Sequence, residues 1–168
     1  MPTLTQLILL SVCLAYSILF ERAKCVEFSW NNIGLVLKIL FLSIVISAIL
    51  YIIRFKYFNF FYDTSKFTNI SDLSFYTLIF SPIVEETVFR GMILKLLKKY
   101  SNILLSIFFS SILFTIFHKV PFYLDIFILS FGLGYIYTKF GIWYSVATHF
   151  AYNLILPITI TFVLRIVQ

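Results

Sequence analysis

Long apolar stretches separated by short polar joints run through the whole chain. A helix needs about 20 mainly apolar residues to cross the hydrocarbon core of a bilayer, and six stretches reach or approach that length. They cover residues 4–20, 33–53, 73–100, 103–118, 122–137 and 142–163. The pattern predicts an all-α fold, a polytopic transmembrane helical bundle of about six spanning helices.

Two polar joints divide the first half of the chain. Residues 21–24 read Glu-Arg-Ala-Lys, and residues 54–72 form the longest non-apolar segment, which predicts a surface loop or an interfacial helix. The first apolar stretch lacks a basic start and a small-residue cleavage site, so we expect a retained span and not a signal peptide. The expected division is residues 1–72, with two N-terminal spans and their loop, and residues 73–168, a core of four helices.

The composition agrees with a surface that mostly faces lipid. Of the 168 residues, 61% are hydrophobic and 12% are charged, whereas about a quarter of a soluble domain is charged. The net charge of +6 comes from Lys and Arg clustered between the apolar stretches, where they would anchor loops beside anionic headgroups. No basic stripe is present that could follow a nucleic-acid backbone. Membrane lipid is therefore the expected partner, and nucleic acid is not.

The two cysteines carry no recognisable metal or redox pattern. Cys13 and Cys25 form no C-x-x-C pair, so they imply neither a zinc site nor a disulfide framework. Cys13 lies inside an apolar stretch, which predicts a small core residue.

Charged residues lie inside the third apolar stretch, where they are costly and therefore suggest function. Glu86 and Arg90 are four residues apart on one helical face and can form an ion pair. Glu85 points about a quarter-turn away from that pair and is the candidate working carboxylate. Pro82 lies one turn earlier and predicts a kink that frees backbone carbonyls.

The only two histidines of the chain lie in later helices. His118 ends the fourth stretch, while His149 and Asn153 are four apart on the last helix and point the same way. Convergence of these side chains with Glu85 would suit amide hydrolysis by water. A carboxylate and an imidazole can activate the water, while an amide and a second imidazole can stabilise the oxyanion. Taken singly, an intramembrane Glu–Arg pair or a His–Asn pair is more often structural, bridging helices within a bundle.

Three motifs follow one another in the second half of the chain. They are E-E-x-x-x-R at residues 85–90, F-x-x-x-H at residues 114–118 and H-x-x-x-N at residues 149–153. In this order they resemble the CAAX prenyl protease and bacteriocin-processing family, also called the CPBP or Abi family. The resemblance covers about residues 73–160.

The resemblance implies a membrane-embedded glutamic endopeptidase whose catalytic core is residues 73–168. Glu85 and His118 would activate the water, and His149 and Asn153 would form the oxyanion site, with the Glu–Arg pair in support. Two features depart from the family pattern: the chain is short, and Lys119 follows His118 directly. Lys119 is either an interfacial anchor or a cation that attracts a substrate carboxylate.

Several alternatives remain open at this point. The favoured substrates are membrane-associated or lipidated peptides, such as bacteriocin or pheromone precursors, at a bacterial plasma membrane. A non-catalytic membrane partner or self-immunity protein could bind such peptides without cutting them. A proton-coupled transporter also uses buried Glu and His, but no inverted repeat is visible. Zinc at Glu85, His118 and His149 is a further alternative, yet no H-E-x-x-H motif occurs, so we expect no cofactor.

Overall fold

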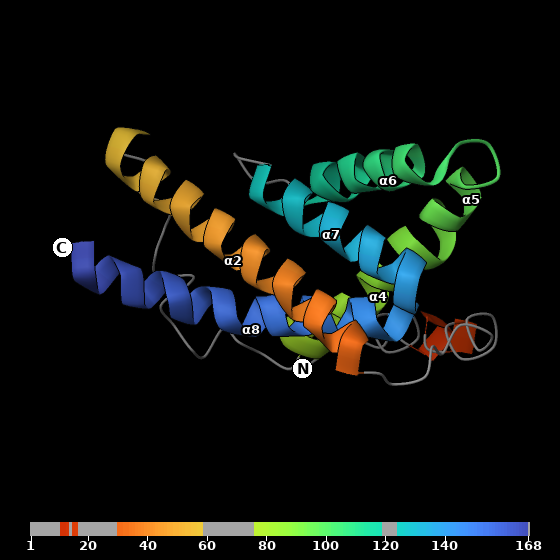
Figure 1. Cartoon of the computed structure of the whole chain (residues 1–168), viewed down its shortest axis with the longest axis horizontal. Coiled ribbons are helices and arrows are strands. Elements are labelled where there is room, and N and C mark those ends of the chain that lie inside the picture. Colours follow the sequence, from red (N-terminus) through yellow and green to blue (C-terminus); the bar gives the residue numbers. More distant parts are fainter. Residues whose placement is uncertain (1–10, 14, 17–29, 59–75, 119–123, 168) are drawn as a thin grey trace.

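The computed structural model describes residues 11–13, 15–16, 30–58, 76–118 and 124–167, and this part of the chain is helical without a strand (Figure 1). The all-α prediction is confirmed. The principal elements, in chain order, are α2 (Trp30–Phe58), η3 (Tyr76–Phe80), α4 (Ser81–Glu86), η4 (Thr87–Leu94), α5 (Lys95–Leu97), α6 (Ile103–Phe117), α7 (Leu124–Phe140) and α8 (Ile142–Val167).

Two of the described helices are long and apolar enough to cross a membrane. They contain the segments Asn32–Ile53 of α2 and Ile142–Val163 of α8. Helix α6 is apolar but has only 15 residues, a length of about 22 Å against a hydrocarbon core of about 30 Å. The described residues thus show two candidate spans, fewer than the six predicted.

Two helix ends differ from the predicted boundaries. Helix α2 continues to Phe58, beyond the predicted end at residue 53, so the predicted 54–72 segment begins as helix. Helix α8 continues to Val167 with Pro157 inside it. Pro157 therefore does not interrupt the last helix, because proline is tolerated inside membrane helices where local adjustments satisfy the backbone.

The segment that carries the charged motif is helical from residue 76 to residue 97 and alternates between π and α geometry. A π-helical turn, η3, ends at Phe80, just before Ser81 and Pro82 begin α4. A second π-helical segment, η4, follows α4, and Phe80, Glu86 and Leu94 all keep right-handed helical backbone angles. Local π geometry is one way in which a membrane helix accommodates proline. Such π segments also occur often at functional sites.

Helix α7 packs closely against two neighbouring helices. Figure 1 shows α2 beside α8, with α7 and then α6 lying beyond α2. A Cβ on Gly132 would lie 2.7 Å from Ile39 Cγ2, and one on Gly134 would lie 2.9 Å from Ile107 Cγ2. The glycines therefore permit the close approach of α7 to both α2 and α6.

Residues in two short connections mark where α6 and α8 begin. Asn102 caps α6 by accepting a hydrogen bond from the Leu105 amide at 2.9 Å. Gly141 joins α7 to α8 with φ of 93°, a conformation that suits glycine.

A buried hydrogen bond joins α2 to α8, since Ser47 Oγ and Tyr152 Oη are 2.7 Å apart. Tyr152 precedes Asn153 directly, so this bond anchors the turn that follows His149.

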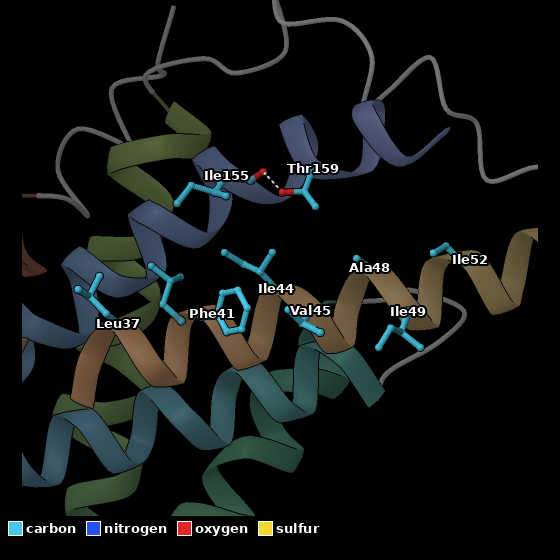
Figure 2. Close-up of a pocket in the computed structure, with 10 residues that line it drawn as sticks. Leu37, Phe41, Ile44, Val45, Ala48, Ile49, Ile52, Ile155 and Thr159 are labelled. Atoms are coloured by element: carbon cyan, nitrogen blue, oxygen red, sulfur yellow. Dashed lines mark hydrogen bonds between the residues drawn. The ribbon is translucent and has the colours of Figure 1, made fainter. Parts of the chain in front are cut away.

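An apolar groove of about 610 Å³ lies between α2 and α8 (Figure 2). Its lining is aliphatic and aromatic apart from one hydroxyl, that of Thr159, which donates to the Ile155 carbonyl at 3.0 Å. The groove and the predicted site share helix α8, which carries Ile155 and Thr159 as well as His149 and Asn153.

Some predictions concern residues outside the described ranges. Cys13 is described and is buried, as predicted. Cys25, Lys119 and residues 59–72 of the predicted loop lie outside the described part of the chain.

Candidate active site

Glu86 and Arg90 form the predicted ion pair in the centre of the protein. Arg90 Nε lies 3.2 Å from Glu86 Oε2, and the exposed fractions of the two side chains are 1% and 0%. Arg90 Nη2 donates to both the carbonyl oxygen and the hydroxyl oxygen of Ser130, each at 2.9 Å. Ser145 donates its hydroxyl to Glu86 Oε2. A buried pair of this kind depends on such additional hydrogen bonds to offset desolvation.

Glu85 has different surroundings from its neighbour, as the helical register predicts. Its side chain is 23% exposed, and the Ser81 hydroxyl donates to its Oε1. Its Oε2 lies 3.5 Å from His118 Nε2 and 3.8 Å from His149 Nε2. Within the described part of the chain, no hydrogen-bond donor satisfies this second oxygen. The Glu85 carboxylate and the imidazoles of His118 and His149 therefore lie close together.

The hydrogen bonds of the two imidazoles fix their orientation. His118 Nδ1 lies 2.8 Å from the Phe114 carbonyl oxygen, which can only accept, so Nδ1 carries a proton. His149 Nδ1 lies 3.0 Å from Glu86 Oε1, and a carboxylate paired with Arg90 also accepts. Both Nδ1 atoms are thus donors, and both Nε2 atoms face the Glu85 carboxylate.

Phe114 forms an apolar wall between the charged groups. Its ring centroid lies 4.3 Å from that of His118 and 5.8 Å from that of His149. The Arg90 guanidinium carbon lies 4.5 Å from the centre of the same ring, a cation–π contact. The first residue of the F-x-x-x-H motif therefore positions three of the polar groups by packing.

Asn153 occupies the half-buried face of α8 one turn beyond His149. The contacts given above join Glu85, Glu86, Arg90, His118 and His149 directly, whereas Asn153 is related to them by its helical spacing from His149. Among the described residues, no group of three or more His, Cys, Asp or Glu side chains is arranged to hold a metal ion.

Sequence reasoning missed three serines that contact the charged residues: Ser81, Ser130 and Ser145. A signal was present for two of them, because Ser81 precedes Glu85 by four residues and Ser145 precedes His149 by four. Ser130 lies forty residues from Arg90, and no local spacing could have indicated that contact.

The fold and the site define a class: an all-helical protein with membrane-length helices and a buried Glu–His–Arg cluster. Residues 69–155 match the family model described as "Type II CAAX prenyl endopeptidase Rce1-like". The match covers more than half of the chain, and the chain therefore belongs to the Rce1-like family. That family consists of membrane-embedded proteases of the CAAX type. Neither a curated protein nor a solved structure matches the chain.

Proposed function

We propose that this chain is an intramembrane endopeptidase that hydrolyses peptide bonds with a water activated by Glu85 and His118. The observation that carries the proposal is the position of Glu85 Oε2 near the Nε2 atoms of both histidines, at 3.5 and 3.8 Å. The separate neutralisation of Glu86 by Arg90 leaves Glu85 available as a base. We further propose six spanning helices, with residues 1–72 as an N-terminal unit and residues 73–168 as the catalytic unit.

Water activation follows from the two acceptors that face each other across the site. A neutral His118 that donates from Nδ1 presents a lone pair at Nε2, and Glu85 Oε2 presents a second one. A water between them can donate a hydrogen bond to each, which polarises its oxygen. The oxygen then attacks the peptide carbonyl carbon while one proton passes to Glu85.

Oxyanion stabilisation falls to the groups on α8. The oxygen of the tetrahedral intermediate would accept hydrogen bonds from His149 Nε2 and from the Asn153 amide. Because His149 Nδ1 already donates to Glu86, donation from Nε2 as well requires the imidazolium form. The proton held by Glu85 then moves to the leaving nitrogen, the C–N bond breaks, and an acid and an amine are released.

We propose that the reaction needs no metal. A carboxylate and two imidazoles can serve as acid, base and oxyanion donors without one. Zinc at Glu85, His118 and His149 is the alternative, and it makes a distinct prediction. Loss of activity on dialysis against a chelator, with recovery on addition of zinc, would show that the mechanism depends on a metal.

The proposed substrates are membrane-associated or lipidated peptides, cut at a bacterial plasma membrane that the chain crosses several times. The apolar groove between α2 and α8 supports this class (Figure 2), because it can shelter an apolar part of a substrate. Processing of bacteriocin or pheromone precursors belongs to this class.

The test uses purified wild-type protein and Glu85→Ala in lipid nanodiscs with a library of membrane-associated peptides, read by mass spectrometry. We expect wild type alone to produce fragment pairs whose masses sum to the peptide plus one water. Tight binding of peptides by both proteins without any fragments would indicate a binding or self-immunity protein and not a peptidase.

A further inference from the structure

Ser81 is a hydroxyl beside the candidate base that neither the three motifs nor the mechanism above uses. It lies four residues before Glu85 on α4, and its Oγ donates to Glu85 Oε1. Glu85 Oε2, which faces both imidazoles, lacks a donor among the described residues. The two oxygens of one carboxylate are thereby made unequal.

The direction of this hydroxyl differs from that of several other helical hydroxyls in the bundle. Ser and Thr in helices commonly donate to the carbonyl four residues earlier. Thr87, Ser111 and Thr115 do so, to Ile83, Ile107 and Ser111 respectively, each at 2.7 Å. Ser81 instead points forward to a side chain. Its hydroxyl is therefore engaged with the carboxylate.

The backbone around Ser81 holds this donor in a fixed place. Ser81 is the first residue of α4, and the π-helical turn η3 ends immediately before it. Pro82 follows, is fully buried, and restricts φ to about −65°. A donor on such a backbone constrains the last torsion of the Glu85 side chain, which is otherwise broad and roughly two-fold.

We propose that Ser81 is a positioning residue that holds Glu85 Oε1, so that Oε2 alone faces His118, His149 and the attacking water. The proposal rests on the proposed peptidase function. By donating to the ionised carboxylate, Ser81 also favours the charged form that can accept the proton from water. Removal of the hydroxyl should therefore slow the reaction and narrow the pH range in which Glu85 acts as a base.

The test compares Ser81→Ala and Ser81→Thr with wild type on a peptide that wild type cleaves. We expect Ser81→Ala to lower kcat roughly 10- to 100-fold with little change in KM, as misplacement of a reacting group does. The acid limb of its pH–rate profile should move up by about one pH unit. Ser81→Thr keeps the hydroxyl and should restore both values.

Ser111→Ala is the matched control, because it removes a buried hydroxyl that donates only to a backbone carbonyl. It should leave the acid limb in place. An unchanged kcat and acid limb in Ser81→Ala would overturn the proposal. So would a Ser81→Ala variant as inactive as Glu85→Ala that Ser81→Thr does not rescue, because Ser81 would then itself react.

A second readout does not depend on activity. Infrared spectra of the protein carrying ¹³C-labelled glutamate follow protonation with pH, and subtraction of Glu85→Gln assigns the Glu85 band. We expect the midpoint of this band to rise in Ser81→Ala and to return to the wild-type value in Ser81→Thr. An unchanged midpoint would refute the role of Ser81, whereas absent cleavage by wild type with a shifted midpoint would refute only the peptidase function.

Discussion

Two adjacent glutamates in this chain occupy different electrostatic surroundings. Glu86 is fully buried and bonded to Arg90, His149 and Ser145, so all of its charge is balanced locally. Glu85 is partly exposed and has one oxygen directed at two imidazoles. A base must be able to exchange a proton with substrate, whereas a support must hold its charge. The geometry therefore fits the proposed division of these two roles between neighbours in the sequence.

Arg90→Ala tests the supporting role of the buried pair. The substitution leaves Glu86 as an uncompensated buried charge, which costs about 3 to 5 kcal/mol in other proteins. We expect a large drop in the unfolding temperature of the purified protein, together with loss of activity. Thermal unfolding in detergent measures the first, and peptide cleavage measures the second.

The double variant Arg90→Met with Glu86→Gln is the control for this prediction. It removes both charges and should recover much of the stability without recovering the activity. Equal unfolding temperatures for wild type and Arg90→Ala would show that the pair does not hold the site together.

At the residue scale, the sequence contained enough information to predict contacts that depend on helical spacing alone. The i, i+4 spacing of Glu86 and Arg90 predicted their ion pair, and the quarter-turn offset predicted the separate surroundings of Glu85. The contact between Arg90 and Ser130 was not predictable, because it depends on the rotation of α7 against the charged helix. The alternation of apolar and polar residues does not specify that rotation.

At the scale of elements, the apolar pattern located the later helices well. The boundaries of α6 and the start of α8 match the predicted stretches, since an Asn cap and a glycine turn mark them in the sequence. The π-helical segments on either side of α4 were not predicted. Pro82 indicated only that the helix is perturbed there, and the way in which the backbone absorbs it depends on the neighbouring helices.

Gly134→Ala tests the close packing of α7 on α6. The new Cβ would lie 2.9 Å from Cγ2 of Ile107, a β-branched side chain that is stiff at χ1. Overpacking of this kind costs about 1 to 3 kcal/mol. We expect the unfolding temperature to fall and the cleavage rate to fall with it, because α7 carries the Ser130 contact to Arg90.

Gly34→Ala on α2 is the matched control for Gly134→Ala. Nothing lies within 4 Å of its added Cβ, and alanine is the better helix former by about 1 kcal/mol. We expect this control to be neutral or stabilising. A Gly134→Ala protein as stable as Gly34→Ala would contradict the close packing.

At the scale of the whole molecule, the charged cluster and the apolar groove lie along the same helix, α8. His149 and Asn153 precede Ile155 and Thr159, which line the groove. We propose that an apolar segment of a substrate lies in this groove between α2 and α8. The number of spans was less predictable, because helices such as α6 are too short to reveal by length whether they cross the bilayer.

Ala48→Trp tests the groove as the seat of the apolar part of a substrate. The larger side chain would fill the space beside Ile44 and Ile52 (Figure 2). We expect KM for a peptide with a long apolar segment to rise about tenfold, equivalent to about 1.4 kcal/mol of binding, with little change in kcat. Leu42→Trp is the control, since Leu42 is exposed on α2 outside the groove. Equal effects of both variants on KM would show that the groove does not bind the apolar segment of the substrate.

The most direct test of the central claim is the rate of peptide cleavage by Glu85→Gln. Glutamine keeps the size of the side chain but cannot accept the proton from water. The account predicts a loss of about 10²- to 10⁴-fold in kcat, the usual contribution of a general base, with an unfolding temperature within a few degrees of wild type. Cleavage by Glu85→Gln at the wild-type rate would contradict the assignment of Glu85 as the base that activates water.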